Sequence, residues 1–139
     1  MYLTRYTDYA FRVLFYLGAA EGRAVPISEM ARAYDISRNH LVKVVHGLVK
    51  AGYLRSTRGR NGGVSLARPS TTIRLGEVVR DTEPDLKLVE CAGCVIAKGC
   101  ALPRPLREAM RAFMQTLDGY SLADVVADTR GLKALVGGH

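Results

Sequence analysis

Residues 26–67 carry the pattern that most constrains this chain: two short helical segments separated by a tight turn and followed by a glycine-rich hairpin. The first helix is expected over residues 27–34 and the second over residues 37–51, with Ser37 as N-cap and Gly52 as C-terminal stop. Apolar residues recur along the second segment at three- and four-residue intervals, which predicts one buried face. That buried stripe consists of Leu41, Val44, Val45 and Leu48.

Two short segments of alternating apolar and polar residues follow, over residues 53–56 and 64–67. The stretch between them, TRGRNGG, is rich in glycine and arginine and contains an asparagine, so it predicts the mobile, basic tip of a β-hairpin. Two helices joined by a tight turn and followed by such a hairpin describe a winged helix-turn-helix.

The remaining periodic segments predict further helices around this unit. A helix is expected over residues 4–20, a short connecting helix over residues 74–81, and a long amphipathic helix over residues 102–117. The opening helix would bury Tyr6, Ala10, Val13, Leu14 and Leu17. The fold class is therefore mainly α with a small β-hairpin wing, a winged helix-turn-helix plus a long dimerisation helix. The expected domains are a DNA-binding winged helix-turn-helix over residues 1–80, a cysteine loop over residues 81–101, and the dimerisation helix with a C-terminal segment over residues 102–139.

The long helix carries an apolar stripe at positions 102, 106, 109, 110, 113 and 117, with two prolines in its first turn. Residues 82–101 offer little apolar material to pack against this stripe. A second copy of the same helix could supply the missing surface, so we expect a homodimer. Beyond the helix, Ser121 and Asp124 have the spacing of a capping box and predict a last short turn.

The charge is distributed unevenly along the chain. Residues 1–80 hold 13 basic and 5 acidic side chains, whereas residues 81–139 hold 7 basic and 8 acidic ones. The net charge of the chain is +7, and its positive excess lies in the first 80 residues. No acidic residue occurs between Asp35 and Glu77. A basic excess confined to one segment indicates a polyanion partner, since solubilising surfaces normally mix both signs. Nucleic acid is the favoured partner.

The basic residues lie where a winged helix-turn-helix meets double-stranded DNA. The start of the second helix is the part that reaches base edges, where arginine can pair with guanine and asparagine with adenine. Arginines on the wing suit a narrow minor groove, and a lysine further along the helix suits phosphates. A winged helix that binds protein or RNA is the alternative. The candidate DNA-binding residues are Ser37, Arg38, Asn39, His40, Lys43, Arg58, Arg60 and Asn61.

The three cysteines, Cys91, Cys94 and Cys100, lie within ten residues of one another. An odd number of cysteines without an export signal does not suit a disulfide framework, so the loop indicates a zinc site or an iron–sulfur cluster. Zinc sites usually take four protein ligands, and only one CxxC pair occurs here. A cluster on three thiolates needs a different fourth ligand, for which the candidates are Asp8, Glu90, His40, His46 and His139.

Several other classes of protein are disfavoured. The longest apolar runs fall short of a membrane span, and the charged first 15 residues do not resemble a secretory signal, so a cytoplasmic protein with no membrane partner is expected. Neither a Ser/His/Asp grouping nor a phosphate loop nor paired carboxylates are recognisable, so we do not expect an enzyme.

Several stretches carry a family resemblance along nearly the whole chain. They are LTRYTDYAFRVLFYL, ISRNHLVKVVHGLVKAGYL, RGRNGGVSLARP, IRLGEVVRDTEP, the three cysteines and LDGYSLADVV. In these features the chain resembles the NsrR family of nitric-oxide-sensing repressors, within the broader winged-helix regulators that include IscR. The combination of SRNHLVK with RGRNGG is more specific than a generic helix-turn-helix.

The resemblance implies a homodimeric transcriptional repressor that binds a palindromic operator in double-stranded DNA. It implies an iron–sulfur cluster on Cys91, Cys94 and Cys100, with 4Fe–4S favoured and 2Fe–2S as the alternative. The fourth ligand would be Asp8 of the partner subunit; IscR uses a histidine three residues beyond its last cysteine, where this chain has Pro103. Nitric oxide would be the signal, with cluster loss or nitrosylation releasing the DNA. The alternatives are an iron–sulfur or redox-responsive regulator of another regulon, and a constitutive DNA-binding protein with a structural zinc site.

Overall fold

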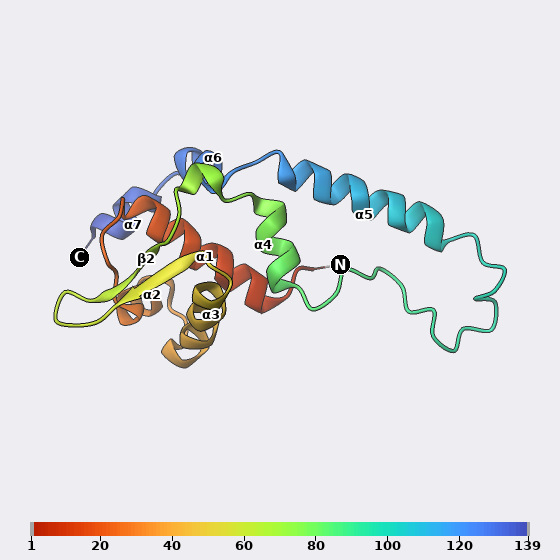
Figure 1. The fold of residues 1–139 in the computed structure, drawn as a ribbon, viewed down its shortest axis with the longest axis horizontal. Coiled ribbons are helices and arrows are strands. Elements are labelled where there is room, and N and C mark those ends of the chain that lie inside the picture. Colours follow the sequence, from red (N-terminus) through yellow and green to blue (C-terminus); the bar gives the residue numbers. More distant parts are fainter. Residues whose placement is uncertain (1, 139) are drawn as a thin grey trace.

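The protein is mainly helical with one two-stranded antiparallel hairpin, as seen in a computed structural model that describes residues 2–138 (Figure 1). The expected fold class is confirmed. In chain order the elements are α1 (Arg5–Ala19), α2 (Ile27–Tyr34), α3 (Arg38–Lys50), β1 (Leu54–Thr57), β2 (Gly63–Leu66), a 3-10 turn η1 (Ser70–Thr72), α4 (Leu75–Thr82), α5 (Pro103–Asp118), α6 (Leu122–Asp128) and α7 (Leu132–Gly137).

Helix α1 is the centre of the core, and α3, α4, α6, α7 and β2 all pack against it. Its buried face differs from the expected one by a polar residue: Thr7 is fully buried, whereas Tyr6 is 37% exposed. Burial of Thr7 is tolerated because its hydroxyl lies within hydrogen-bonding distance of Glu83 and Thr82 on the α4 side. Tyr6 lies instead over α3, where a Cβ on Gly47 would come within 1.9 Å of the tyrosine hydroxyl oxygen.

The helix-turn-helix consists of α2 and α3, and their bounds agree with the sequence prediction to within one residue. Asp35 makes the turn in the left-handed region, with φ of 54°, which aspartate tolerates better than most residues. Ser37 occupies the N-cap position of α3, but its side chain makes no capping hydrogen bond. The buried stripe of α3 is the expected one: Leu41, Val44, Val45 and Leu48.

The wing is the antiparallel pair of β1 and β2, with Leu54 opposite Leu66 and Thr57 opposite Gly63. A third segment lies along its other edge, because Val25 and Val64 exchange both backbone hydrogen bonds, at 2.8 and 2.9 Å. The approach is close at Gly63, where an added Cβ would lie 2.4 Å from the carbonyl carbon and oxygen of Val25. Glycine at this position is therefore required by packing.

After α4 the chain leaves the core and forms an arm, defined here as residues 84–118, whose helix α5 points away from the rest of the molecule (Figure 1). Helix α5 begins with the expected prolines, and Met114 is its buried residue. The sequence predicted little apolar material beside this helix, and that expectation needs correction. Leu86 and Leu88 run along α5 and form one wall of an open groove of about 610 Å³ that Leu106 and Met110 also line.

Beyond the arm the chain returns to α1. The capping box at the start of α6 is confirmed, since Ser121 accepts from the Asp124 N–H and the Asp124 carboxylate accepts from the Ser121 N–H. Helix α7, which the sequence analysis did not foresee, adds Leu132 and Val136 to the core. Residues 2–82 and 121–138 are called the winged body below. Among the described residues, no helix is long and apolar enough to cross a membrane.

Candidate nucleic-acid interface and cysteine loop

The outer face of α3 carries the predicted base-reading residues. Ser37, Arg38, Asn39, His40 and Lys43 are all exposed, at or just before the N-terminal half of the helix. Residues three and four apart share a helix face, so Asn39 and Lys43 lie in one stripe with two further exposed residues. Those residues, His46 and Lys50, extend the same polar face along the helix.

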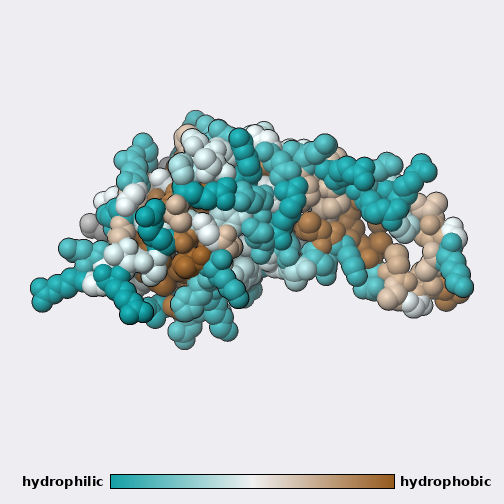
Figure 2. Space-filling view, in the orientation of Figure 1, coloured by the Kyte–Doolittle hydropathy of each residue, from teal (hydrophilic) through white to brown (hydrophobic). Residues whose placement is uncertain are grey.

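The wing carries the second group of predicted residues at its tip. Arg58, Arg60 and Asn61 are exposed in the turn between β1 and β2. Gly59, with φ of 110°, turns the chain between the two arginines. The tip projects from one end of the molecule, and hydrophilic side chains cover that end (Figure 2).

The predicted DNA-contacting cations make no ion pair with a carboxylate in the described part of the chain. Elsewhere five arginines form ion pairs with carboxylates: Arg12, Arg23, Arg68, Arg80 and Arg104. Within the part of the chain that the structure describes, no acidic partner lies within 4.0 Å of Arg38, Lys43, Arg58 or Arg60. Cations without a carboxylate partner are available for phosphates.

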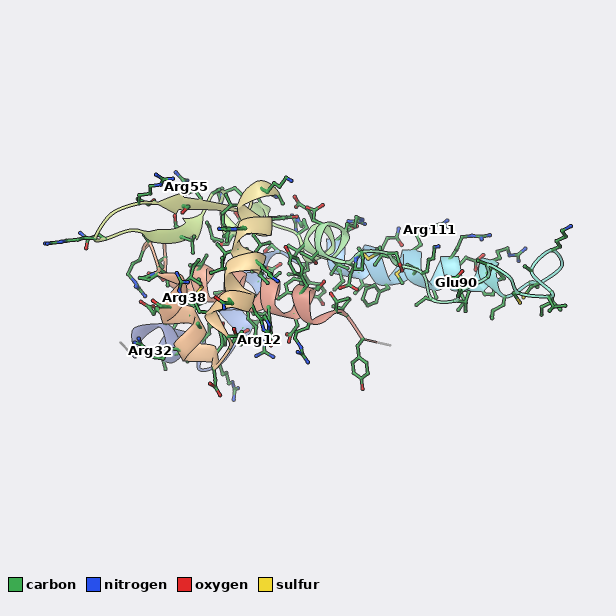
Figure 3. All side chains as sticks on the ribbon, turned by 90° about the horizontal axis from the view of Figure 1, so that it is seen from below. Arg12, Arg32, Arg38, Arg55, Glu90 and Arg111 are labelled. Carbon is green, nitrogen blue, oxygen red and sulfur yellow. The ribbon has the colours of Figure 1, made fainter. Side chains whose placement is uncertain are left out.

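Sequence reasoning did not single out one exposed arginine of the helix-turn-helix. Arg32 on α2 is exposed, and Figure 3 shows it on the winged body with Arg38 and Arg55, whereas Glu90 and Arg111 lie on the arm. Arg55 belongs to the acid-free segment, so the charge distribution pointed to it. Arg32 precedes that segment, and only its place on the first helix of the helix-turn-helix could have indicated it.

The cysteine loop lies on the arm, apart from the winged body. Cys91 and Cys94 are exposed, Cys100 is half-buried, and all three are free thiols. Successive turns shape the segment, with backbone hydrogen bonds from Cys94 to Cys91, from Ala97 to Cys94 and from Gly99 to Ile96. Across residues 2–138, side chains of His, Cys, Asp and Glu do not gather in any group of three or more that could hold a metal ion. The thiols are thus adjacent in sequence without being drawn together.

The donor set of the loop still fits an iron–sulfur cluster. Three free thiols lie in a turn-rich segment outside the hydrophobic core, so they could turn toward one metal centre without opening that core. Beside them Val95 is fully exposed and Ile96 is 65% exposed.

Asp8, predicted as the fourth ligand, is exposed on α1 and does not point into the core. It is not free: its carboxylate forms a two-point pair with Arg12, at 2.9 and 3.3 Å. The Arg12 guanidinium also lies over the Tyr9 ring, 5.7 Å from the centroid. An exposed i,i+4 ion pair contributes only about 0.3–0.5 kcal/mol. Breaking the Asp8–Arg12 pair would therefore cost Asp8 little if it bound a metal.

The other candidate ligands are less well placed. Glu90 is exposed beside Cys91, but its carboxylate accepts the backbone N–H of Ala92 at 2.9 Å and so supports the local turn. His40 and His46 lie on α3, on the candidate DNA face. His139 lies outside the described residues.

A polar cluster joins the start of α1 to the end of α4, just before the arm begins. The Glu83 carboxylate accepts hydrogen bonds from the Thr4 backbone N–H at 2.9 Å, from the Thr4 hydroxyl at 2.7 Å and from the Thr7 hydroxyl. Partial burial raises the pKa of Glu83, but the hydrogen bonds from Thr7 and Thr4 outweigh it and hold the pKa below its ordinary value. Sequence reasoning missed this cluster, because no local pattern brings residues 4 and 83 together.

The chain also matches known proteins along most of its length. Residues 3–128 match the Rrf2 family, described as iron-dependent transcriptional regulators. A protein of Listeria innocua described as a transcriptional regulator has 26% identity and a TM-score of 0.79, covering 93% of this chain and 88% of that one. IscR of T. potens has 26% identity and a TM-score of 0.73, covering 92% and 88%. CymR, the global cysteine regulator of B. subtilis, shares the fold at 22% identity and a TM-score of 0.73, covering 93% and 98%.

Proposed function

The chain belongs to the Rrf2 family of DNA-binding transcriptional regulators, which are not enzymes, and from that premise we propose that it is a homodimeric repressor controlled by an iron–sulfur cluster that senses nitric oxide. The observation that carries this proposal is the coexistence of an unpaired basic surface on α3 and the wing with three free thiols on the arm. A regulator that reads DNA acts where the chromosome is, so the cytoplasm is the proposed location.

The DNA-reading part of the proposal assigns a role to each group of residues. Arg38 and Asn39 approach base edges in the major groove, with Ser37 and His40 beside them, and Lys43 neutralises phosphate. Arg58, Arg60 and Asn61 on the wing approach the flanking minor groove. In a twofold dimer the two α3 helices would read palindromic half-sites about 34–36 Å apart.

Cys91, Cys94 and Cys100 would hold the cluster of one subunit, and Asp8 of the partner subunit would complete the ligand set. A bound cluster supplies iron that reacts with nitric oxide. Asp8 would exchange its pair with Arg12 for the metal, so the first turn of α1 would be tied to the partner's arm. Tying the two subunits fixes the separation of their α3 helices, and loss of the tie lowers operator affinity. A coupling of about 1–3 kcal/mol gives a 5- to 150-fold change.

The dimer contact is proposed to use the apolar side of the arm. Of the sixteen residues in α5, only Met114 is buried, and Leu102 is 51% exposed. Apolar surface runs along the arm in Figure 2, under the hydrophilic side chains of α5. Contacts with α4, Leu86 and Leu88 leave an open apolar groove on this helix, and an amphipathic helix with an open apolar side is typical of a subunit interface.

The test compares three proteins purified and handled without oxygen: wild type, Cys94→Ala and Asp8→Ala. Iron, sulfide and zinc are measured, together with the visible spectrum and the operator affinity before and after nitric oxide. Wild type should contain iron and sulfide and bind the operator, and nitric oxide should weaken binding. Cys94→Ala should remain a folded dimer without the cluster and without specific affinity. Asp8→Ala should keep a cluster on three thiolates, with a shifted spectrum and reduced affinity.

Three outcomes would contradict the proposal. Zinc in place of iron and sulfide would favour the constitutive DNA-binding alternative with a structural metal. Iron and sulfide without a response to nitric oxide would favour a redox or iron–sulfur regulator of another regulon. Identical spectra and affinities for wild type and Asp8→Ala would remove Asp8 from the ligand set and leave it as a helix-dipole partner.

A further inference from the structure

Both ends of the wing are held at their base by one short helix, α4. Tyr53 directly precedes β1, is fully buried, and donates its hydroxyl to the Asp81 carboxylate at 2.5 Å. Arg68 follows β2 and forms a two-point pair with Glu77, at 2.7 and 3.0 Å. The Arg68 guanidinium also lies 5.5 Å from the centroid of the Tyr53 ring. The strand that enters the wing and the strand that leaves it are therefore anchored to neighbouring turns of α4.

The electrostatics of these anchors agree with their geometry. Burial raises the pKa of Tyr53 well above its ordinary value, and the hydrogen bond to Asp81 raises it further, so the phenol stays a donor. The hydrogen bonds from Arg68 hold the pKa of Glu77 below its ordinary value, so the carboxylate stays charged at neutral pH. The Tyr53 hydroxyl therefore remains a donor and the Glu77 carboxylate remains charged at neutral pH, where DNA would be bound.

The same helix also holds the arm. Arg80, one residue before Asp81, forms a two-point pair with Asp118 at the end of α5, at 2.8 and 2.7 Å. The carboxylate approaches so closely because α4 has no side chain at Gly76, where a Cβ would lie 1.9 Å from an Asp118 oxygen. This pair is therefore one of the contacts by which α4 holds the end of α5, beside the packing of the two helices.

We propose that α4 couples the arm to the wing. Glu77 and Asp81 are the positioning residues that hold the two ends of the wing, and Arg80 is the residue through which α4 follows a movement of α5. Glu77, Arg80 and Asp81 lie within five consecutive residues of α4, so a displacement of α5 that moves Arg80 moves both wing anchors with it. A helix is stiff over one turn because its backbone hydrogen bonds fix each residue to the next turn. The inference rests on the proposed function only in giving the wing a role in DNA binding.

The coupling is tested by amide hydrogen exchange of the full-length protein without DNA. Asp118→Asn cuts the arm-side pair, and Glu77→Gln with Asp81→Asn cuts the wing-side anchors. Each should speed exchange of the β1 and β2 amides about three- to tenfold and leave α1 and α3 unchanged. Adding Asp118→Asn to the wing-side double variant should produce no further increase, because the path between the two sites is already broken.

Two further variants keep the result interpretable. Glu108→Gln removes the Arg104–Glu108 pair, which lies entirely on α5, and should leave exchange in the wing unchanged. Gly76→Ala displaces the Asp118 carboxylate while replacing glycine with a better helix former, so it should reproduce the Asp118→Asn effect without loosening α4.

Exchange in the wing that stays at the wild-type rate in both Asp118→Asn and Gly76→Ala would overturn the coupling. So would additive increases when the arm-side and wing-side changes are combined. Since the measurement needs neither operator nor cluster, it is decided independently of the proposed function, which would fail instead through absent iron or absent operator binding in the wild type.

Discussion

The winged body and the arm differ in how much apolar surface they bury within the chain. The body has a core in which α1, α2, α3, the wing, α4, α6 and α7 share fully buried side chains. The arm, residues 84–118, has Met114 as its buried side chain, leaves the cysteines largely in solvent and holds an open apolar groove. The body therefore has a core of its own, whereas the arm buries little of its surface within the chain. Under the proposed function this difference would let a signal rearrange the arm without unfolding the winged body.

The largest expected effect separates the two regions by stability. Leu14→Ala, at a fully buried position on α1, should lower the free energy of unfolding by about 2–5 kcal/mol, since it removes apolar contacts and leaves a cavity. Leu102→Ala on the arm, where the leucine is 51% exposed, should change it far less. Urea unfolding followed by circular dichroism measures both. Equal losses would mean that the arm belongs to the same cooperative core.

The next effect concerns association. Met110→Asp places a charge in the half-buried stripe of α5 and should weaken dimerisation about 100-fold, or about 2.7 kcal/mol, because the carboxylate would have to be desolvated in the interface. Sedimentation equilibrium gives the dissociation constant. Gln115→Asp, at an exposed position of the same helix, is the control. A Met110→Asp protein that dimerises like wild type would place the interface elsewhere.

Within the body, the two kinds of DNA contact should separate. Arg38→Ala should cost about 1–3 kcal/mol at particular operator positions, because it removes a base contact. Lys43→Ala should weaken binding to all sequences alike and reduce the slope of log affinity against log salt by about 1. Binding to an operator series at several salt concentrations measures both. Unchanged operator discrimination by Arg38→Ala would move the base contacts away from the start of α3.

The smallest effect is at the junction of the two regions. Because its folded-state pKa is lowered, Glu83 stabilises the fold above its unfolded-state pKa of about 4.3 and loses that contribution as the pH falls through the lower folded value. Glu83→Gln should therefore flatten the acid side of the stability curve between about pH 5 and pH 3. Urea midpoints across that range measure the slope. Parallel curves for wild type and variant would show that the junction does not titrate with folding.

The sequence predicted the body well because its signals are local. Helical periodicity, the turn at Asp35 and the glycine-rich hairpin each act within a few residues, and the structure confirms all of them. The buried face of α1 was predicted wrongly at two positions because their partners are far away in sequence. Thr7 is buried because Thr82 and Glu83 satisfy its hydroxyl, whereas Tyr6 lies beside Gly47 of α3 and stays partly exposed. Helix α7 is short, and its weak pattern becomes a helix only where Leu132 and Val136 reach the core.

The site divides in the same way. Exposure of the predicted residues on α3 and the wing follows from helix and hairpin geometry, so the sequence could foresee that surface. The pairing of Asp8 with Arg12 follows from i,i+4 spacing, but its bearing on metal binding does not. The anchors on α4 join residues 28 and 9 positions apart in Tyr53–Asp81 and Arg68–Glu77, and no periodicity announces them. They depend on where the two ends of the wing meet α4 in the folded chain.

Gly63 limits where substitutions can change the DNA sequence preference of such a protein during evolution. Any side chain there would collide with the Val25 backbone, so substitutions at the base of the wing are expected to be purged whatever the DNA sequence being read. At the exposed tip, Arg58, Arg60 and Asn61 meet no such obstacle, whereas Gly59 is constrained by its φ of 110°. Variation that retunes binding should accumulate at the tip. A laboratory library that randomises residues 58, 60 and 61 and leaves Gly59 and Gly63 fixed would sample variants that keep the fold of the wing.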